Sequence, residues 1–409
     1  MKAARIYPKA VITAKGTRWV ENGHPWIYEA EVKELSSEPE NGSLVDAVSE
    51  KGKYLGTGFY SKHSKIRIRL ISRNANDTFD EAFWRRRIQY AWDYRRTVMR
   101  DDLSCCRIIF GEADGFPGLT MDRFNDILVT QTLSIGMERL KPVIIPAAVE
   151  ILRNSGETIS GVYERNDVPI RQLEGLDEYK GWYMPETLGK PEHTVTRICE
   201  NGIYYDVDVE NGQKTGFFLD QKYNRLAVAR IARDKRVLDC FTYTGSFALN
   251  AAAGGALSVT AVDVSESAIQ MARHNAMINN LQDRIAFQTA NIFDLLPELE
   301  RQGKKPFDFI ILDPPAFTKS RKTVSSAEKG YKEINYRAMK LLPRGGYLAT
   351  ASCSHFMSHE KFEKMLLSAA SDAKVELKQI EVRQQSPDHP ILWNVPETDY
   401  LKFYLFQVI

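Results

Sequence analysis

The chain has 409 residues, of which 43% are hydrophobic, and a formal net charge of +2 at pH 7. This composition is typical of globular proteins, and the length predicts two or three domains. No apolar stretch of the sequence reaches the roughly 20 residues of a membrane span, and the basic N-terminus lacks the apolar core of a signal peptide. Five scattered cysteines lack the paired spacing of a zinc site. We therefore expect a cytoplasmic protein with free thiols and with neither a metal ion nor a membrane partner.

Charge is distributed unevenly along the chain. Residues 1–100 contain 19 lysines and arginines against 12 acidic residues, whereas residues 101–409 carry a net negative charge. A basic first part joined to an acidic second part favours a polyanion held by the first and chemistry carried out by the second. A basic surface that is merely solvated is the simpler alternative.

Residues 1–73 predict a small β-barrel. Short apolar runs separated by turns that contain glycine are typical of strands, as in VITAKG, HPWIYEAEVKEL, SLVDAVSEKGKYLGTGFY and KIRIRLIS. The strict alternation in KIRIRLIS places three cations on one face of that strand. Cations mixed with rings suit unpaired RNA, and the alternative is an exposed barrel face over core aromatics. The candidate RNA-binding residues are Lys15, Arg18, Trp26, Lys62, Lys65, Arg67 and Arg69.

Residues 74–185 predict a compact α+β domain. It begins with a long helix, TFDEAFWRRRIQYAWDYRRTVM, in which an apolar stripe lies opposite Arg85, Arg86, Arg95 and Arg96. A strand pair over 107–134, a helix near Met137–Arg153 and a strand at GVYERND are expected to follow. The arginine face either lies along phosphates or is solvated, and the second is the simpler interpretation.

Residues 186–409 predict an α/β domain with a parallel sheet, because strands alternate with helices after an initial β stretch. Its central unit is strand, turn, helix and strand over 236–265, with a helix at Ser246–Ala253. Asp239 and Asp263 end the two strands, at the 24-residue spacing of units in which an acidic side chain grips ribose hydroxyls. The turn offers only Gly245, too few glycines for a pyrophosphate. S-adenosylmethionine therefore fits better than a nicotinamide cofactor, and an ordinary doubly wound sheet is the alternative.

Polar or reactive side chains end five of the predicted strands. These residues are Asp239, Asp263, Asn291, Asp313 and Cys353. Ligands of open α/β sheets bind beyond the carboxyl ends of the strands. We therefore expect these five side chains to share one site.

Two of these residues predict the chemistry. Asp313 ends the strand in FIILDPPAF, and the two prolines after it stiffen a loop that suits a flat base; a structural turn is the alternative. Cys353, in TASCSHFM, is a candidate nucleophile, because carbon 5 of a pyrimidine takes a methyl group only after a thiolate has added to carbon 6. Backbone amides at the transition from strand to helix would stabilise that thiolate. A plain buried cysteine is the alternative.

The chain resembles the family of ribosomal large subunit methyltransferase I over all three segments. The matching stretches are HPWIY, GTGFY, KIRIRLIS, KTGFFLDQKYNR, VLDCFTYTGSFA, AVDVS, LDPPAF, KGYKEIN, SCS, PDHP and YLKF. The resemblance implies a PUA RNA-binding barrel over 1–73, a central α+β domain over 74–185 and a Rossmann-like methyltransferase domain over 186–409. It also implies formation of 5-methylcytosine in 23S ribosomal RNA, with S-adenosylmethionine as the cofactor.

The resemblance further implies roles for single residues. Cys353 is then the nucleophile and Asp313 contacts the base. Asn291 stands where the family usually has an aspartate, although its carbonyl oxygen can still accept from the adenine amine. The expected cofactor contacts are Lys214, Phe217, Asp220, Asp239, Phe241, Tyr243, Thr244, Gly245, Asp263, Ser265, Asn291, Phe293, Asp313 and Pro315.

Three other functions stay open. A guanine N2-methyltransferase acting on ribosomal RNA would use Asp313 and the proline loop without a thiol, although Ala316 separates the prolines from the aromatic residue that amine methyltransferases carry there. The second alternative is an RNA-binding assembly factor whose enzyme domain is vestigial. The third is a nicotinamide-dependent dehydrogenase, whose cofactor needs more glycines than the turn at Gly245 offers. Naked 23S RNA and a partly assembled subunit are both open as substrates, and edge strands near the C-terminus allow a homodimer.

Overall fold

The computed structural model describes residues 5–317 and 324–409. Contacts divide the chain into two compact units. The first unit consists of residues up to 198, 206–219 and 387–398, and the second of residues 199–205, 220–386 and 399–409. Among the described residues, none of the helices has the length and apolar character that crossing a membrane requires.

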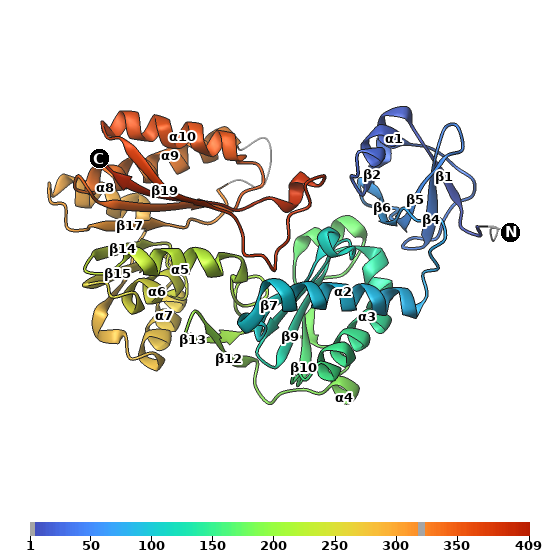
Figure 1. Cartoon of the computed structure of the whole chain (residues 1–409), viewed down its shortest axis with the longest axis horizontal. Helices are drawn as coiled ribbons and strands as arrows, with labels where there is room; N and C mark the ends of the chain where they lie inside the picture. Colours follow the sequence, from blue (N-terminus) through green and yellow to red (C-terminus); the bar gives the residue numbers. More distant parts are fainter. Residues whose placement is uncertain (1–4, 318–323) are drawn as a thin grey trace. The chain divides into compact units, whose positions relative to one another are not determined.

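The first unit opens with a curled six-stranded sheet, drawn in blue in Figure 1. Its strand order is β2-β6-β5-β4-β1-β3, with β1 and β4 parallel to each other and the other neighbours antiparallel. Its core is built from fully buried apolar side chains on alternating strand positions, such as Ile12, Val45 and Ile68. The strands are β1 (Lys9–Ile12), β2 (Trp26–Tyr28), β3 (Val32–Leu35), β4 (Leu44–Ser49), β5 (Tyr54–Tyr60) and β6 (Ile66–Ser72).

A helix, α1 (Ala14–Glu21), lies where the stretch VITAKG predicted a continuous strand. The strand ends at Ile12, and Thr13 caps the helix because its Oγ1 accepts a hydrogen bond from the Gly16 N–H at 3.2 Å. The expectation of a strand through residue 16 is therefore wrong. A capping hydroxyl outweighs the β-branched residues just before it.

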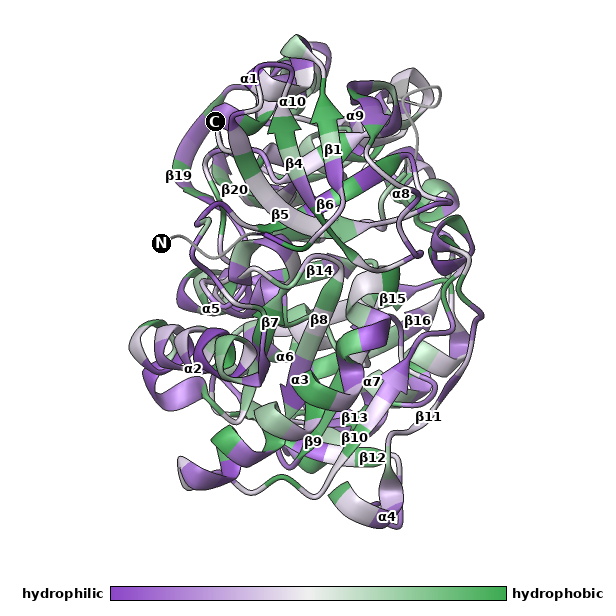
Figure 2. Ribbon diagram, turned by 90° about the vertical axis from the view of Figure 1, so that its right-hand side faces the viewer, coloured by the Kyte–Doolittle hydropathy of each residue, from purple (hydrophilic) through white to green (hydrophobic). Residues whose placement is uncertain are grey.

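The first unit also contains a five-stranded sheet with helices α2 (Glu81–Val98) and α3 (Ile135–Asn154) packed against each other. In Figure 2 the strand β9 carries mainly the hydrophobic colour, whereas α2 carries the hydrophilic colour along much of its ribbon. Three strands lie where a strand pair was expected, and the predicted helix near 137–153 is confirmed. The strand order is β11-β10-β9-β8-β7. The strands are β7 (Cys105–Phe110), β8 (Leu119–Phe124), β9 (Ile127–Thr132), β10 (Gly161–Arg165) and β11 (Lys180–Trp182).

Arg95 lies in the core of this unit rather than on the expected arginine face of α2. Its side chain is fully buried and forms two hydrogen bonds with the Asp114 carboxylate, at 2.6 and 2.8 Å. It also donates to the carbonyl oxygens of Arg107 and Asp388, each at 2.8 Å. The prediction for Arg95 is therefore wrong, because a guanidinium whose donors are all used inside the protein can be buried. The other arginines of that face stay at least partly exposed.

The second unit is an α/β fold around a seven-stranded sheet. Its order is β16-β15-β14-β17-β18-β20-β19, and only β20 runs antiparallel to both of its neighbours. The strands are β14 (Arg236–Cys240), β15 (Ser258–Asp263), β16 (Ile285–Thr289), β17 (Phe309–Leu312), β18 (Tyr347–Ser352), β19 (Leu377–Arg383) and β20 (Lys402–Val408). The predicted parallel sheet is therefore confirmed.

Helices cover both faces of this sheet. Figure 1 shows α9 and α10 on one face and α6 and α7 on the other. The helices are α5 (Lys222–Ile231), α6 (Ser246–Ala253), α7 (Glu266–Ile278), α8 (Ile292–Arg301), α9 (Val324–Leu341) and α10 (His359–Ala373). The β stretch expected before them forms a two-stranded sheet of β12 (Val195–Glu200) and β13 (Ile203–Asp208). Since β14 to β18 are parallel, their carboxyl ends meet at one edge of the sheet, where the candidate site was predicted.

Candidate active site

Acidic side chains at the strand ends form an electrostatically coupled group. Asp239 is fully buried in β14, Asp263 ends β15, and Asp313 follows β17 directly. Burial raises the pKa of Asp239 to about 8, and the charges of Asp313 and Asp263 add to this effect. The structure therefore brings these three predicted residues together.

Asp263, at the end of β15, accepts hydrogen bonds that connect the turn after β14 to β15. Its Oδ2 accepts a hydrogen bond from the Tyr243 N–H and its Oδ1 from the Ser265 N–H, both at 2.9 Å. The turn is sharp, since Phe241, Tyr243 and Gly245 have φ angles of 65°, 49° and 85°. A carboxylate offers about four acceptor positions, so Asp263 retains the capacity for the predicted ribose contact.

Asp239 suits a cationic ligand. Its Oδ2 accepts a hydrogen bond from the Thr242 hydroxyl at 2.5 Å, while its buried Oδ1 has no hydrogen-bond partner within the described chain. Thr244, further along the turn, is nearly buried as well. An unsatisfied carboxyl oxygen beside two other carboxylates is costly unless a cation joins the group. S-adenosylmethionine carries an ammonium and a sulfonium, so the residues present fit this cofactor.

Asn291 and Phe293 lie at the start of α8, at the end of the site expected for adenine. The Asn291 side-chain carbonyl caps the helix, because it accepts a hydrogen bond from the Phe293 N–H at 3.1 Å. The Phe293 ring is 40% exposed and its centroid lies 5.7 Å from that of Phe317. One lone pair of the Asn291 carbonyl is therefore already used, and its adenine contact stays a prediction.

The proline loop carries an aromatic residue, Phe317, four positions after Asp313. Gln221 donates from Nε2 to Asp313 Oδ1 at 2.9 Å, and the Phe317 ring centroid lies 4.6 Å from that of Tyr331. Pro315 is exposed. Sequence reasoning missed Gln221 and Tyr331 as single residues, although both lie in the stretches KTGFFLDQKYNR and KGYKEIN.

Cys353 directly follows β18, and its side chain is partly exposed. The Tyr331 hydroxyl is fully buried and interacts electrostatically with both Cys353 and Asp313. Burial raises the pKa of Tyr331 to about 12, so the hydroxyl stays protonated at neutral pH. Cys240 differs, because complete burial raises the pKa of its thiol well above the ordinary range and leaves it as inert packing. Cys353 is therefore the more accessible thiol of the two.

Three residues expected near the cofactor belong to different units. Lys214 and Phe217 lie in the first unit and Asp220 in the second. Asp220 Oδ2 accepts a hydrogen bond from the Tyr400 hydroxyl at 2.7 Å, and Lys214 Nζ lies 4.8 Å from the ring centroid of Phe218. Their contacts with a cofactor stay predictions.

Carboxylates of the first unit pair with several of the predicted RNA-binding cations. The partners are Glu29 for Arg67, Glu38 for Lys62 and Glu174 for Arg69. Trp26 is held as well, because its Nε1 donates to Glu112 at 2.8 Å. Within the predicted set, the exposed cations that form no ion pair with a described carboxylate are Lys15, Arg18 and Lys65. These three are therefore the cations of the predicted set that are available to phosphates.

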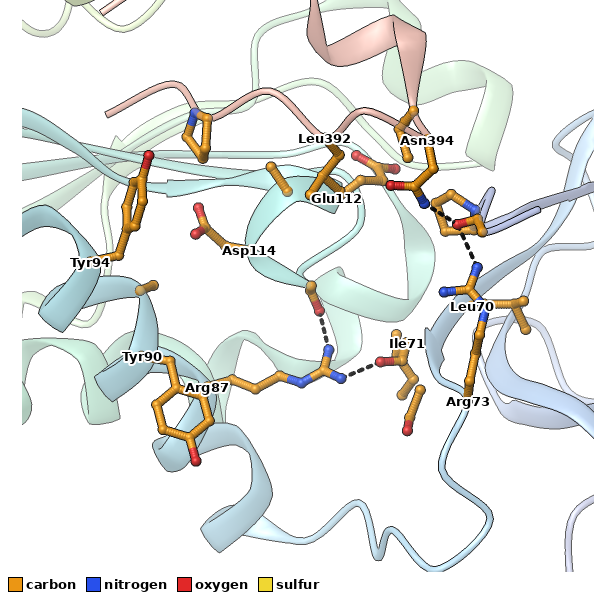
Figure 3. A pocket seen from close by; sticks show the side chains of 18 of the residues that line it. Leu70, Ile71, Arg73, Arg87, Tyr90, Tyr94, Glu112, Asp114, Leu392 and Asn394 are labelled. Carbon is orange, nitrogen blue, oxygen red and sulfur yellow. Dashed lines mark hydrogen bonds between the residues drawn. The ribbon is translucent and has the colours of Figure 1, made fainter. Parts of the chain in front are cut away.

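A cavity of about 780 Å³ lies within the first unit, and Figure 3 shows it from close by. It is lined by β6, by α2 and by residues 390–395. The Arg87 guanidinium reaches into this region and donates to the Gly115 carbonyl at 2.8 Å, and Arg73 donates to the Gly23 carbonyl at 2.6 Å. None of the residues predicted for methyl transfer lines this cavity. It is therefore not the candidate active site.

Comparison with known families defines the class of protein. A family of S-adenosylmethionine-dependent methyltransferases matches residues 161–406, and a PUA-like domain family matches residues 11–73. The fold agrees, since a crystal structure of SMU.776 complexed with SAH superposes with a TM-score of 0.83 at 23% sequence identity, over 98% of this chain and 99% of the other. The chain is an S-adenosylmethionine-dependent methyltransferase with an N-terminal PUA-like domain.

Closer relatives define the family within this class. The ribosomal RNA large subunit methyltransferase I of Klebsiella pneumoniae is 38% identical over 99% of both chains. The protein of the same name from Tolumonas auensis is 41% identical over 94% of this chain and 96% of the relative. The chain belongs to the ribosomal RNA large subunit methyltransferase I family.

Proposed function

We propose that this chain methylates carbon 5 of a cytosine in the ribosomal RNA of the large subunit, with S-adenosylmethionine as the methyl donor. The name of the relatives supports the class of RNA. The choice of base rests on Cys353, a partly exposed thiol at a strand end, next to the buried hydroxyl that also interacts with Asp313. This thiol is the observation that carries the proposal.

The cofactor supplies an electrophilic methyl group when it is bound. Cytosine carbon 5 is a weak nucleophile, and Cys353 activates it. Its thiolate sulfur bonds to carbon 6, and the displaced electron pair makes carbon 5 nucleophilic enough to take the methyl group. A base then removes the proton of carbon 5, the freed electron pair restores the double bond, and sulfur leaves with the pair of its bond to carbon 6.

The neighbouring residues bind and orient the base. Asp313, held by the Gln221 amide, accepts from the exocyclic amine of cytosine, and the Phe317 ring of the same loop, packed against Tyr331, forms a wall for a flat base. At the cofactor end, Asp239 and Asp263 attract the cationic group and hold the ribose hydroxyls. The exposed cations of the barrel contact phosphates of the RNA.

The test is mass spectrometry of nucleosides from 23S ribosomal RNA after incubation with the protein and methyl-labelled S-adenosylmethionine. We expect label in 5-methylcytosine with the wild type, and at least about a thousandfold less with Cys353→Ala, because removing a covalent nucleophile has effects of this size or larger. Cys199→Ala is the matched control, since it removes an exposed thiol of the second unit that lies outside the site.

Two outcomes would overturn the proposal. Full cytosine methylation by Cys353→Ala would exclude the covalent route. Label in a methylated guanosine that survives the same substitution would instead identify a guanine N2-methyltransferase, for which Asp313 and the proline loop suffice.

A further inference from the structure

Lys402 is a buried cation beside the candidate nucleophile. It begins β20, and in the antiparallel pairing of β18 with β20 it lies opposite Ser352, the residue before Cys353. Its side chain is only 1% exposed. Directly opposed residues of antiparallel strands keep their Cβ atoms about 5 Å apart. Lys402 is therefore held next to the turn that carries Cys353.

Backbone carbonyls, rather than carboxylates, accept the hydrogen bonds of this ammonium. Nζ donates to the carbonyl oxygen of Ser354 at 2.7 Å and to that of Tyr400 at 2.8 Å. Lys402 forms no ion pair with any carboxylate in the described part of the chain. The similarly buried Lys141, in contrast, pairs with Glu164 at 2.9 Å. A buried cation without a counter-ion is costly, which indicates a role beyond packing.

Two anionic groups act on this ammonium. The charge of Asp399 and that of a Cys353 thiolate both favour the protonated form of Lys402. Burial has the larger effect and lowers the pKa of Lys402 to about 8, so the group is still mostly protonated at neutral pH. Asp399 Oδ1 also lies 3.3 Å from His359 Nε2. Asp399 is therefore shared between Lys402 and a histidine.

We propose that Lys402 is a positioning residue for the methyl transfer. It fixes the turn at Cys353 through the Ser354 carbonyl, and its positive charge stabilises the Cys353 thiolate. This inference rests on the proposed function, in which Cys353 reacts as a thiolate. The thiol proton passes to water before the bond between sulfur and carbon 6 forms, and Lys402 keeps its protons throughout. The same charge stabilises the sulfur when that bond breaks.

Other titratable groups also act on this part of the site. Tyr331 from α9 is neutral and interacts electrostatically with Cys353, while Asp313 acts on Tyr331 and Asp399 acts on Lys402. Both carboxylates are negative and disfavour a nearby thiolate. Lys402, in contrast, carries a positive charge, which favours the thiolate.

The test measures the rate at which iodoacetamide alkylates Cys353 in the full-length protein without cofactor or RNA, from pH 5.5 to 10, by peptide mass spectrometry. Lys402→Gln keeps a donor for the carbonyl oxygens but removes the charge. We expect it to slow alkylation at pH 7 by about tenfold and to raise the pH midpoint by about one unit, the lower end of the shifts that a neighbouring opposite charge causes. Lys402→Arg keeps the charge and is expected to restore most of the rate.

Several controls make the result decisive. The exposed Cys199 thiol is an internal reference in each sample, and Lys378→Met removes an exposed lysine of β19. If the glutamine is not accommodated, Lys402→Met replaces the ammonium by an apolar chain of similar length. A midpoint that is the same in the wild type and in the uncharged variants would overturn the inference.

Failure of this inference and failure of the proposed function are distinguishable. Alkylation reports on Cys353 whatever base the enzyme methylates, so full methylation by Cys353→Ala would refute the function without changing the alkylation profile. For the methylation itself, Lys402→Gln is expected to lower kcat about tenfold with little change in KM for RNA, because the charge acts on sulfur and not on RNA binding. An unchanged alkylation profile with an intact requirement for Cys353 would refute Lys402 alone.

Discussion

The barrel of the first unit and the strand ends of the second unit handle charge in opposite ways. In the barrel, cations meet carboxylates nearby: Arg5 pairs with Asp46 at 2.7 Å, and Arg69 with Glu174 at 2.8 Å. At the ends of three neighbouring strands, the charges of Asp313 and Asp263 act on Asp239, and Asp239 keeps an oxygen without a hydrogen-bond partner in the described chain.

This difference distinguishes two kinds of charged group: those paired within the protein, which stabilise the fold, and those whose expected partner is a bound ligand. A cation paired with a buried carboxylate is poorly available to phosphates, because breaking the pair would leave the carboxylate buried without a counter-ion. A cluster of like charges lowers stability, and such clusters occur at functional sites, where a bound ligand of opposite charge offsets that loss. The comparison therefore predicts that the strongest effects on binding come from the second unit, and that barrel cations paired with buried carboxylates affect stability instead.

Among the effects on ligand binding and stability, the largest is expected from Asp239→Asn. Loss of a charged hydrogen-bond acceptor for a cationic ligand weakens S-adenosylmethionine binding by about 10- to 150-fold, equivalent to about 1.5–3 kcal/mol. The same substitution is expected to stabilise the cofactor-free protein at pH 8.5. The folded-state pKa of about 8 lies above the ordinary value of 3.8, so this carboxyl favours folding below pH 4 and loses that contribution as the pH rises through 8. Calorimetric titration and thermal unfolding from pH 4 to 9 measure the two effects.

Asp308→Asn is the matched control for that experiment. The hydrogen bond from Arg236 lowers the pKa of Asp308, so this carboxylate contributes stability above its unfolded pKa, and that contribution is lost as the pH falls. Its replacement is expected to leave cofactor binding unchanged and to lower stability slightly at neutral pH. The difference in stability between the wild type and Asp239→Asn should change with pH. A constant difference would contradict the assignment of Asp239 as a buried carboxyl whose pKa is raised and whose expected partner is a cationic ligand.

The sequence predicted much of the second unit because its signals are local. The helix Ser246–Ala253 has the predicted bounds, and the strand-end carboxylates follow from the alternation of strands and helices. Arg95 and Lys402 escaped prediction because their hydrogen-bond partners are distant in sequence, such as Asp114 and Ser354. Helical periodicity indicates which face is polar, but it does not reveal a partner that allows a charge to be buried.

An effect of similar size, on stability alone, is expected from Gly245→Ala, which tests whether the turn geometry holds the carboxylates together. Gly245 has a φ of 85°, and an added Cβ would lie 2.7 Å from Leu249 Cδ1 and 3.0 Å from Ala272 Cβ. Strain and overpacking together are expected to lower the free energy of unfolding by about 2–3 kcal/mol. Urea unfolding measures this loss. Gly303→Ala is the control, because Gly303 has a φ of 66° but no atom within 4 Å of an added Cβ, so it isolates the backbone term of about 1 kcal/mol.

The smallest effect concerns RNA binding by the barrel and separates Lys65 from Arg69. Lys65 is exposed and forms no ion pair within the described residues, so Lys65→Ala is expected to weaken RNA binding about two- to fivefold and to reduce the slope of log affinity against log salt by about one. Arg69→Ala is expected to leave that slope unchanged, because Arg69 is already neutralised by Glu174, whose side chain is 3% exposed. Its effect appears instead as lower thermal stability, since the glutamate is left buried without a partner.

Filter binding at several salt concentrations distinguishes the two variants. Equal slopes for both would mean that the paired cations of the barrel also contact phosphate, and that local pairing does not separate structural charges from binding charges in this protein.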